Sequence, residues 1–584
     1  MLRPICAAGI RTLTRIGPPP PHALVRHLSI HTRTTAALSH ALPRASIAAS
    51  AVGITHTSPS PSPFAWARAR MAYASTAALP AADADIYSSP ATTTTTSSSQ
   101  DSTSTSTDIT KPIVAYHLFV LAFLVYAIVV VGGLTRLTES GLSITEWNPG
   151  FKGMQLPTTD EGWHAEWDKY KLTPEFVLLN QRMSLEDFKS IYMWEWAHRV
   201  LGRVIGVAFV FPAAYLLLRP GYVAKGTRWK LLAMGLGIGF QGALGWFMVK
   251  SGLSNPTTSP SPQAQALRDA GMSPPPIPSA IFDAKDSHST ADSSNWTPRV
   301  SHFRLAAHLG TAFLVYLGML HTGLSILRDY KLAKNEGTVA GVPLSSSTSN
   351  AASSRGQLLN TLNHPSVRKY ARSVRNLGIF VFVTAMTGAL VAGLDAGLVY
   401  NEWPTMGGEG RLAPPMDELL DERYRLRSSS STKESGSDWK LWTGNVFNNP
   451  TTVQLLHRTL ASTAFVAVLG LAYKTRSLRL ALLKQNVHLP PLVPRLAALG
   501  VGAVTLQASL GITTLLYLVP IPLASAHQAG SLALLSVLVA LAVAVRRPGG
   551  VKAILERSSP VANAVWKEEV RRKALGRVAA VQST

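Results

Sequence analysis

Residues 194–218 read WEWAHRVLGRVIGVAFVFPAAYLLL, and this stretch decides the fold class of the chain. After Arg199 the stretch contains one further charged side chain, that of Arg203. Its length is close to the roughly 20 residues that cross a bilayer. No water is available inside the bilayer to satisfy backbone N–H and C=O groups, so a segment of this kind must be an α-helix. The stretch therefore indicates a membrane-spanning protein.

The rest of the 584-residue chain has the same character, with 46% hydrophobic and only 15% charged residues. This composition supplies more apolar length than one soluble core needs. Eight apolar segments are long enough to span a bilayer, approximately Ile113–Leu134, Trp194–Leu218, Leu231–Val249, Leu305–Ile326, Leu377–Leu398, Leu455–Tyr473, Leu496–Val519 and Leu523–Val545. The sequence therefore predicts an all-α polytopic membrane protein with eight transmembrane helices.

The first part of the chain differs from the rest in its charges. Arginines are frequent from the start, and no acidic residue occurs before Asp83. An arginine-rich, acid-poor start without a long apolar segment is typical of a mitochondrial transit peptide. Cys6 is the single cysteine, which excludes internal disulfides, cysteine-ligated zinc and cysteine-ligated iron–sulfur clusters.

The formal net charge of +23 indicates topology rather than a nucleic-acid partner, because no basic face interleaved with aromatic residues is present. Four alternate segments outside the spans carry 26 basic and 5 acidic residues, and the intervening segments carry 16 basic and 21 acidic residues. By the positive-inside rule, the first set and both mature termini face the matrix. We therefore expect a multi-pass protein of the mitochondrial inner membrane, with the lipid bilayer as its surroundings.

An internal repeat divides the eight segments into two sets of four. The stretch from Gly132 to Trp147 aligns with that from Gly388 to Trp403 at an offset of 256 residues. Further matches follow in the same order: His198-Arg199 with His457-Arg458, Gln241–Gly245 with Gln507–Gly511, and His308 with His527. Duplication of one unit explains this pattern, so we expect two pseudo-symmetric four-helix bundles.

The repeat and the charge pattern together set the expected domain boundaries. They are a transit peptide and disordered leader (1–110), an N-terminal four-helix half (111–330), a matrix-side linker (331–375), a C-terminal four-helix half (376–546) and a basic matrix-side tail (547–584). Stretches 254–300, 335–365 and 405–445 are rich in Ser, Pro, Gly and charge, and we expect flexible insertions there.

Four histidines lie near the starts of the even-numbered spans, namely His198, His308, His457 and His527. All four should lie at a similar depth on the intermembrane-space side, two in each half. Polar groups inside spans are costly and usually functional, and two imidazoles facing each other across a bundle can bind a haem iron. A single membrane histidine more often serves packing, but the matched positions favour haem ligation.

Charged residues accompany the histidines of the two halves. Arg199 and Arg458 directly follow a histidine and could hold haem propionates, although arginines that extend to the lipid headgroups fit equally well. Glu195 precedes His198 by three residues on nearly the same helical face, and Gln454 stands at the equivalent position of the second half. We expect Glu195 to be catalytic, with an ion pair to Arg199 as the alternative.

The motifs WEWAHR (194–199), GLTRLTESGLS (133–143), HFRLAAHL (302–309), NEWP (401–404) and QLLHR (454–458) resemble the haem A synthase family over residues 113–546. The resemblance implies an enzyme that oxidises a methyl group of haem O to the formyl group of haem A, for cytochrome c oxidase. It also implies that His457 and His527 bind the iron of haem b, that His198 and His308 flank the iron of the substrate haem O, and that Glu195 is essential. Many bacterial members carry a cysteine pair in an outer loop, which this chain lacks.

The resemblance further suggests partners: the farnesyltransferase that makes haem O, and a ferredoxin with its ferredoxin reductase as the electron source. A homo-oligomer stays open. Two other functions compete with the enzyme. One is a transmembrane dihaem electron carrier, which would need haems at both membrane faces, and the other is a non-catalytic haem chaperone or assembly factor, in which Glu195 would be incidental.

Overall fold

The computed structural model describes residues 109–148, 150–253, 299–344, 351–408, 410–426 and 438–547. The predicted leader, the insertion at 254–298 and nearly all of the basic tail lie outside these residues. Eight of the described helices are long and apolar enough to cross a membrane. They are α1 (Pro112–Leu137), α4 (Leu185–Leu218), α5 (Lys225–Leu253), α7 (His302–Lys334), α9 (Pro365–Gly393), α12 (Pro450–Leu483), α13 (Leu492–Leu516) and α14 (Ile521–Val545). The predicted all-α polytopic fold with eight spans is confirmed.

Several helices extend beyond the apolar segments that predicted them, because local capping rather than hydropathy sets their ends. A capping box between Ser184 and Asp187 starts α4, ten residues or so before the expected span. The Asn449 side chain accepts a hydrogen bond from the backbone N–H of Thr451 at the start of α12. By contrast, α9 ends at Gly393, before the end of the predicted fifth span. A separate short 3-10 helix, η4 (Ala396–Leu398), covers the last residues of that span.

The helix contacts follow the order of the repeat. In the first half α1 packs against α4 and α7, and α5 packs against the same two helices. In the second half α9 packs against α12 and α14, and α13 packs against the same two helices. In each set, therefore, α4 and α7, or α12 and α14, lie diagonally opposite each other. Whether the two halves form separate pseudo-symmetric bundles stays a prediction, because α7 also packs against α9 and α14, and α1 packs against α14.

Polar contacts between the halves accompany this packing. The Tyr126 hydroxyl donates to the carbonyl oxygen of Ala529 at 3.0 Å, and the Gln528 amide donates to the carbonyl oxygen of Val129 at 2.8 Å. The buried guanidinium of Arg328 donates to carbonyl oxygens at the end of α14. Inside a bilayer such groups need partners within the protein, so these bonds fix how α1 and α7 meet α14.

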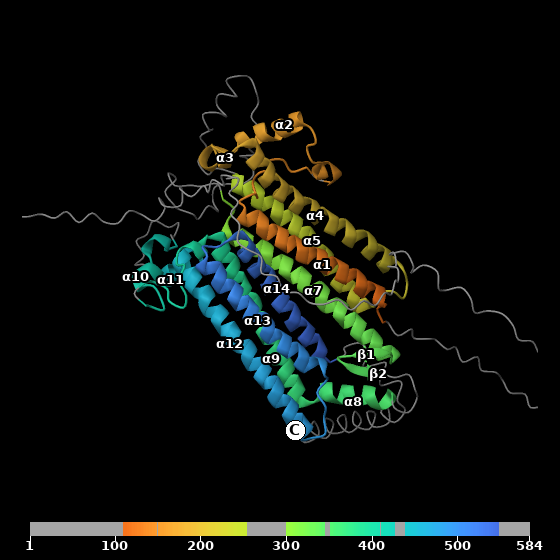
Figure 1. Ribbon diagram of the computed structural model, residues 1–584. Helices are drawn as coiled ribbons and strands as arrows, with labels where there is room; N and C mark the ends of the chain where they lie inside the picture. Colours follow the sequence, from red (N-terminus) through yellow and green to blue (C-terminus); the bar gives the residue numbers. More distant parts are fainter. Residues whose placement is uncertain are drawn as a thin grey trace, which may run out of the picture. The chain divides into compact units, whose positions relative to one another are not determined.

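Smaller elements cover the ends of the spans (Figure 1). At one end lie η1 (Gly150–Met154), α2 (Asp160–Lys171), α3 (Pro174–Leu179), α10 (Met416–Leu419), η5 (Glu422–Tyr424) and α11 (Asp438–Asn448). At the other end lie β1 (Gly337–Val339), β2 (Val342–Leu344) and α8 (Ala351–Asn363). The strands form an antiparallel hairpin in which Val339 pairs with Val342.

The prediction of flexible insertions at 335–365 and 405–445 differs from this structure. Within 335–365 the side chains of Val339, Leu344, Leu358 and Leu362 are buried against Leu332 of α7. Burial of apolar surface offsets the entropy cost of ordering a connection. The apolar residues are few and far apart in the sequence, so composition alone suggested a flexible segment. Within 405–445, the described residues likewise include α10, η5 and α11.

Candidate functional site

The structure brings the predicted first histidine pair together. His198 lies on α4 and His308 on α7, the diagonal helices of the first half, and their ring centres are 6.4 Å apart with the ring planes inclined by 59°. In the second half His457 lies on α12 and His527 on α14, the corresponding diagonal helices. Each half therefore places its two histidines on diagonal helices, and haem ligation by them stays a prediction.

The first pair has the separation that a shared metal requires. An imidazole nitrogen binds a metal at about 2 Å, and adding about 1 Å from that nitrogen to the ring centre places two rings roughly 6 Å apart across one ion. The observed 6.4 Å agrees with this value. The residues present therefore fit a haem iron bound between two imidazoles.

A glycine on a neighbouring helix makes room for each of the four rings. A Cβ atom placed on that glycine would lie 2.7–3.4 Å from the ring Cε1 atom. The contacts are Gly132 with His198, Gly245 with His308, Gly388 with His457 and Gly511 with His527. These are matching positions of the repeat, so the duplication preserved the ring together with the space beside it.

The hydrogen bonds of the ring Nδ1 atoms differ between the halves. In the second half Nδ1 of His457 lies 3.0 Å from the Thr387 hydroxyl, and Nδ1 of His527 lies 3.2 Å from the carbonyl oxygen of Gln507. In the first half the Nδ1 atoms of His198 and His308 are buried and have no hydrogen-bond partner among the described residues. The two histidine pairs therefore occupy equivalent positions but differ in the hydrogen bonds of their Nδ1 atoms.

Glu195 is buried and bound from two sides. Its Oε2 accepts hydrogen bonds from the Ser143 hydroxyl at 2.7 Å and from the backbone N–H of Ile144 at 2.8 Å. Its Oε1 forms an ion pair with Arg199 at 2.6 Å. The alternative interpretation of Glu195, a partner of Arg199 one turn along the helix, is thus realised in the structure. It does not remove the carboxylate from the site, since Glu195 and His198 share a helical face.

The two predicted propionate-binding arginines hold equivalent loops in this structure. Arg199 donates to the carbonyl oxygens of Ile144 and Glu146, both at 2.9 Å. Arg458 donates to those of Tyr400 at 2.8 Å and Glu402 at 3.0 Å. Residues 144 and 146 align with 400 and 402 in the repeat. Their visible role is to fasten the loop after the first helix of each half, and propionate binding stays a prediction.

The second half has an amide where the first has its carboxylate. Gln454 is buried, and its Nε2 donates to the carbonyl oxygen of Tyr400 at 2.9 Å, while its Oε1 has no partner among the described residues. Glu195 instead accepts from the backbone N–H of the equivalent Ile144. The difference in residue type therefore reverses the direction of the hydrogen bond at matching loop positions.

An aromatic cap covers the start of α4 on the Glu195 side. Buried rings of Trp167, Tyr170, Phe188 and Tyr192 pack together there. Glu175 of α3 is also buried in this region, with 5% of its surface exposed. Burial raises the pKa of Glu175 to about 8, and the charges of Glu195 and Glu139 contribute to the shift. A glutamate in a polar stretch resembles a solvated charge, so the burial of Glu175 could not be predicted from the sequence.

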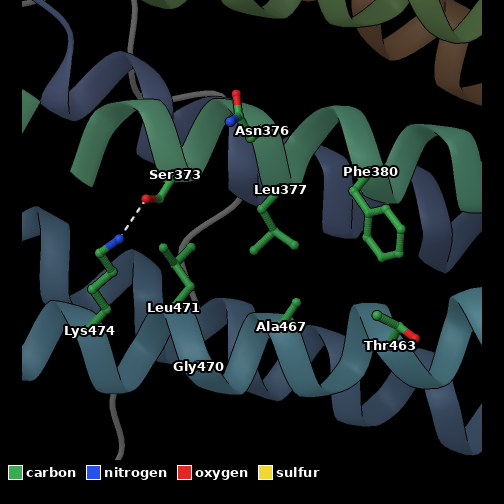
Figure 2. A pocket seen from close by; sticks show the side chains of 9 residues that line it. All are labelled: Ser373, Asn376, Leu377, Phe380, Thr463, Ala467, Gly470, Leu471 and Lys474. Atoms are coloured by element: carbon green, nitrogen blue, oxygen red, sulfur yellow. Dashed lines mark hydrogen bonds between the residues drawn. The ribbon is translucent and has the colours of Figure 1, made fainter. Parts of the chain in front are cut away.

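A groove of about 440 Å³ lies between α9 and α12, away from the predicted ligands (Figure 2). Its wall is apolar along Leu377, Phe380 and Leu471, and Lys474 donates to the Ser373 hydroxyl at 2.7 Å at one end. None of its lining residues is a predicted site residue. We therefore place the candidate site at the histidine pairs and not in this groove.

The fold and the site define a class: a polytopic membrane protein with two repeat-related histidine pairs, each ring beside a glycine of a neighbouring helix. Within that class, the chain belongs to the COX15-CtaA family, described as cytochrome oxidase assembly protein, whose profile matches residues 115–539.

Relatives in fungi and in humans support this membership. The chain is 41% identical over 442 residues to heme A synthase COX15 of Saccharomyces cerevisiae, covering 75% of this chain and 76% of the yeast protein. It is 37% identical over 409 residues to heme A synthase COX15 of Homo sapiens, covering 70% of this chain and 76% of the human protein. It is also 40% identical over 432 residues to a heme A synthase-mitochondrial ferredoxin fusion protein of Schizosaccharomyces pombe, covering 74% of this chain and 59% of the fusion.

The histidines, the arginines and Glu195 were predicted as site residues from the sequence, whereas the residues that contact them were not. The four glycines stood inside the aligned repeat segments, so their recurrence was the signal that could have revealed them. Thr387 gave no such signal, because its equivalent in the first half is Val131.

Proposed function

We propose that this chain is a haem A synthase of the mitochondrial inner membrane, an oxidoreductase that converts a methyl group of haem O to the formyl group of haem A. The observation that carries the proposal is the pair His198 and His308, whose ring spacing fits a haem iron in a chain 41% identical to a heme A synthase. A multi-pass mitochondrial protein with both mature termini in the matrix agrees with the charge distribution.

The two halves have different tasks in this proposal. His457 and His527 bind haem b, and His198 and His308 flank the iron of the substrate haem O. Bound haem b supplies a one-electron redox centre for the oxidation. The presence of Glu195 in the first half and Gln454 in the second supports this division, because a carboxylate can accept a proton and an amide cannot.

Glu195 is the proposed catalytic residue. Oxidation of a methyl group through an alcohol to an aldehyde releases protons as well as electrons. A buried carboxylate beside the substrate haem can accept the protons. Ser143, Ile144 and Arg199 fix its orientation. Glu175 carries a proton at neutral pH, because burial raises its pKa to about 8. A second buried acid near Glu195 thus supports proton transfer from this side of the site.

The proposed partners are those that the family resemblance implies. They are the farnesyltransferase that makes haem O, and a ferredoxin with its reductase as the electron source. The fusion of a heme A synthase with a mitochondrial ferredoxin in Schizosaccharomyces pombe supports the ferredoxin. The competing dihaem carrier is disfavoured, because all four histidines lie in the first parts of helices that start from the same side.

Analysis of bound haems tests the proposal. Wild-type protein and the variants His198→Ala and His457→Ala are purified from membranes, and their haems are extracted and separated by chromatography. We expect His457→Ala to lose haem b, and His198→Ala to keep haem b without forming haem A. Haem A production by both variants at the wild-type level would overturn the proposal.

A further inference from the structure

The two histidine pairs differ in the hydrogen bonds of their Nδ1 atoms. Both Nδ1 atoms of the second pair have a partner, and neither of the first pair has one among the described residues. A metal-binding histidine normally donates its second ring N–H to a carbonyl or another acceptor, which fixes the tautomer and makes the ring a better ligand. Loss of such a partner typically lowers metal affinity about 10- to 100-fold. The presence or absence of the Nδ1 partner therefore bears on how firmly each half holds a haem.

In the second half the Thr387 hydroxyl is placed to accept a hydrogen bond from His457. The Thr387 hydroxyl has one proton, which it donates to the carbonyl oxygen of Thr384 at 2.7 Å. Its oxygen lies 3.0 Å from Nδ1 of His457, so the remaining interaction requires a proton on Nδ1. This places the lone pair of His457 on Nε2, the nitrogen left for the iron.

His527 also has its Nδ1 partner on α13. Its Nδ1 lies 3.2 Å from the carbonyl oxygen of Gln507 and 3.1 Å from the Gln507 amide nitrogen. The Gln507 amide also donates to the carbonyl oxygen of His527 at 2.9 Å. The side chain and the backbone of Gln507 together hold the ring and its helix turn.

The first half keeps the glycines and loses the Nδ1 support. Val131 stands at the repeat position of Thr387 and has no hydrogen-bonding side chain. Gln241, the equivalent of Gln507, still donates to the carbonyl oxygen of His308 at 2.8 Å. The Nδ1 atoms of His198 and His308 nevertheless stay without a partner within the described part of the chain.

We propose that Thr387 is a positioning residue that makes the second histidine pair a permanent haem site, while Val131 leaves the first pair an exchangeable one. The inference rests on the proposed function, since it takes both pairs as haem ligands. Exchange suits the first half, because a substrate haem must enter and its product must leave. A resident redox cofactor needs slow loss, which a fixed tautomer on His457 provides.

Haem loss and redox potential test the role of Thr387. The full chain is purified with bound haem b, and transfer of that haem to excess apomyoglobin is followed by its absorption spectrum. We expect Thr387→Val to lose haem b about 10-fold faster or more, with a more positive midpoint potential because the ring donates less electron density. Thr387→Ser keeps the hydroxyl and should restore wild-type behaviour.

Thr384→Val is the matched control. Thr384 is as buried as Thr387 on the same helix, and its hydroxyl donates to the carbonyl oxygen of Phe380. The variant changes this side chain and keeps the Thr384 backbone carbonyl, which accepts from Thr387 and hydrogen-bonds to His457. We expect this variant to retain haem b at the wild-type rate. The converse variant Val131→Thr should slow the loss of haem O from the first half several-fold.

The outcomes separate this inference from the proposed function. If His457→Ala loses haem b but Thr387→Val matches the wild type in both haem loss and potential, the positioning role of Thr387 is wrong and the proposed function stands. If His457→Ala keeps its full haem b, haem ligation by the second pair fails, and the inference fails with it.

Discussion

Glu195 and Arg199 form an ion pair one turn apart on α4, with 2.6 Å between Oε1 of the carboxylate and Nη2 of the guanidinium. Both side chains are almost fully buried, with 4% and 10% of their surfaces exposed. The pair also binds the loop after α1, through Ser143 and Ile144. One interaction therefore links the proposed catalytic group, the helix of His198 and the loop that closes this end of the first half.

Replacement of Glu195 by Gln should stop the oxidation and leave the cofactor in place. Glutamine has the shape of glutamate but cannot take up a proton at neutral pH. We expect Glu195→Gln to bind haem b normally and to accumulate haem O or a hydroxylated intermediate, with at least about 100-fold less haem A. Chromatography of extracted haems measures this. Glu146→Gln, a more exposed change in the same loop, is the control, and normal haem A from Glu195→Gln would remove the catalytic assignment.

The glycine beside His457 should be essential for haem b. A methyl group at Gly388 would approach Cε1 of His457 to 3.0 Å, and overpacking of this kind costs about 1–3 kcal/mol, or roughly 5- to 150-fold in affinity. We expect Gly388→Ala to lower haem b occupancy, measured from the absorption spectrum of the purified protein. Gly378→Ala on the same helix meets nothing within 4 Å and should keep its haem. Equal occupancy in both variants would contradict a ring-spacing role.

Arg199 and Arg458 should differ in their importance for stability. Both donate to loop carbonyls, and Arg199 also compensates the buried charge of Glu195. Removal of one partner of a buried ion pair costs about 3–5 kcal/mol, whereas lost hydrogen bonds to carbonyls cost less. We expect Arg199→Met to unfold at a lower temperature than Arg458→Met in the same detergent. Combining Arg199→Met with Glu195→Gln should recover part of the loss, and the absence of any recovery would argue against the pair.

The stability of the cap should fall as the pH rises, because of Glu175. Burial raises the pKa of this carboxyl from 4.5 to about 8. Because the pKa is raised in the folded state, the protonated acid stabilises the folded protein, and this contribution is fully present below about pH 4.5. This contribution is lost as the pH rises through about 8, at up to about 1.4 kcal/mol for each pH unit crossed.

Glu175→Gln stays neutral at every pH, so the variant should gain stability over the wild type as the pH rises from about 5 to 9. Thermal unfolding of both proteins across this range measures the difference. Glu161→Gln changes an exposed glutamate of α2 and should follow the wild type. Parallel pH dependence of Glu175→Gln and the wild type would show that Glu175 is not buried as an acid.

The sequence by itself determined the class of fold and the position of the chemistry. Long apolar segments such as 194–218 must be helices in a bilayer, because backbone groups have no other partners there. The repeat placed His198 and His308 in register with His457 and His527, and the contrast of Glu195 with Gln454 distinguished the halves. These features are readable because each depends on local spacing along one helix or on the comparison of two stretches.

Only the tertiary structure decided what each of these side chains contacts. The Glu195 carboxylate could have been free or paired, and its partners Ser143 and Ile144 come from another segment of the chain. The support of His457 by Thr387 joins α12 to α9 across 70 residues of sequence. Hydropathy and spacing define which face of a helix is polar, but the direction of a hydrogen bond depends on how neighbouring helices are rotated and shifted. Packing of the whole bundle sets that rotation, so no single segment encodes it.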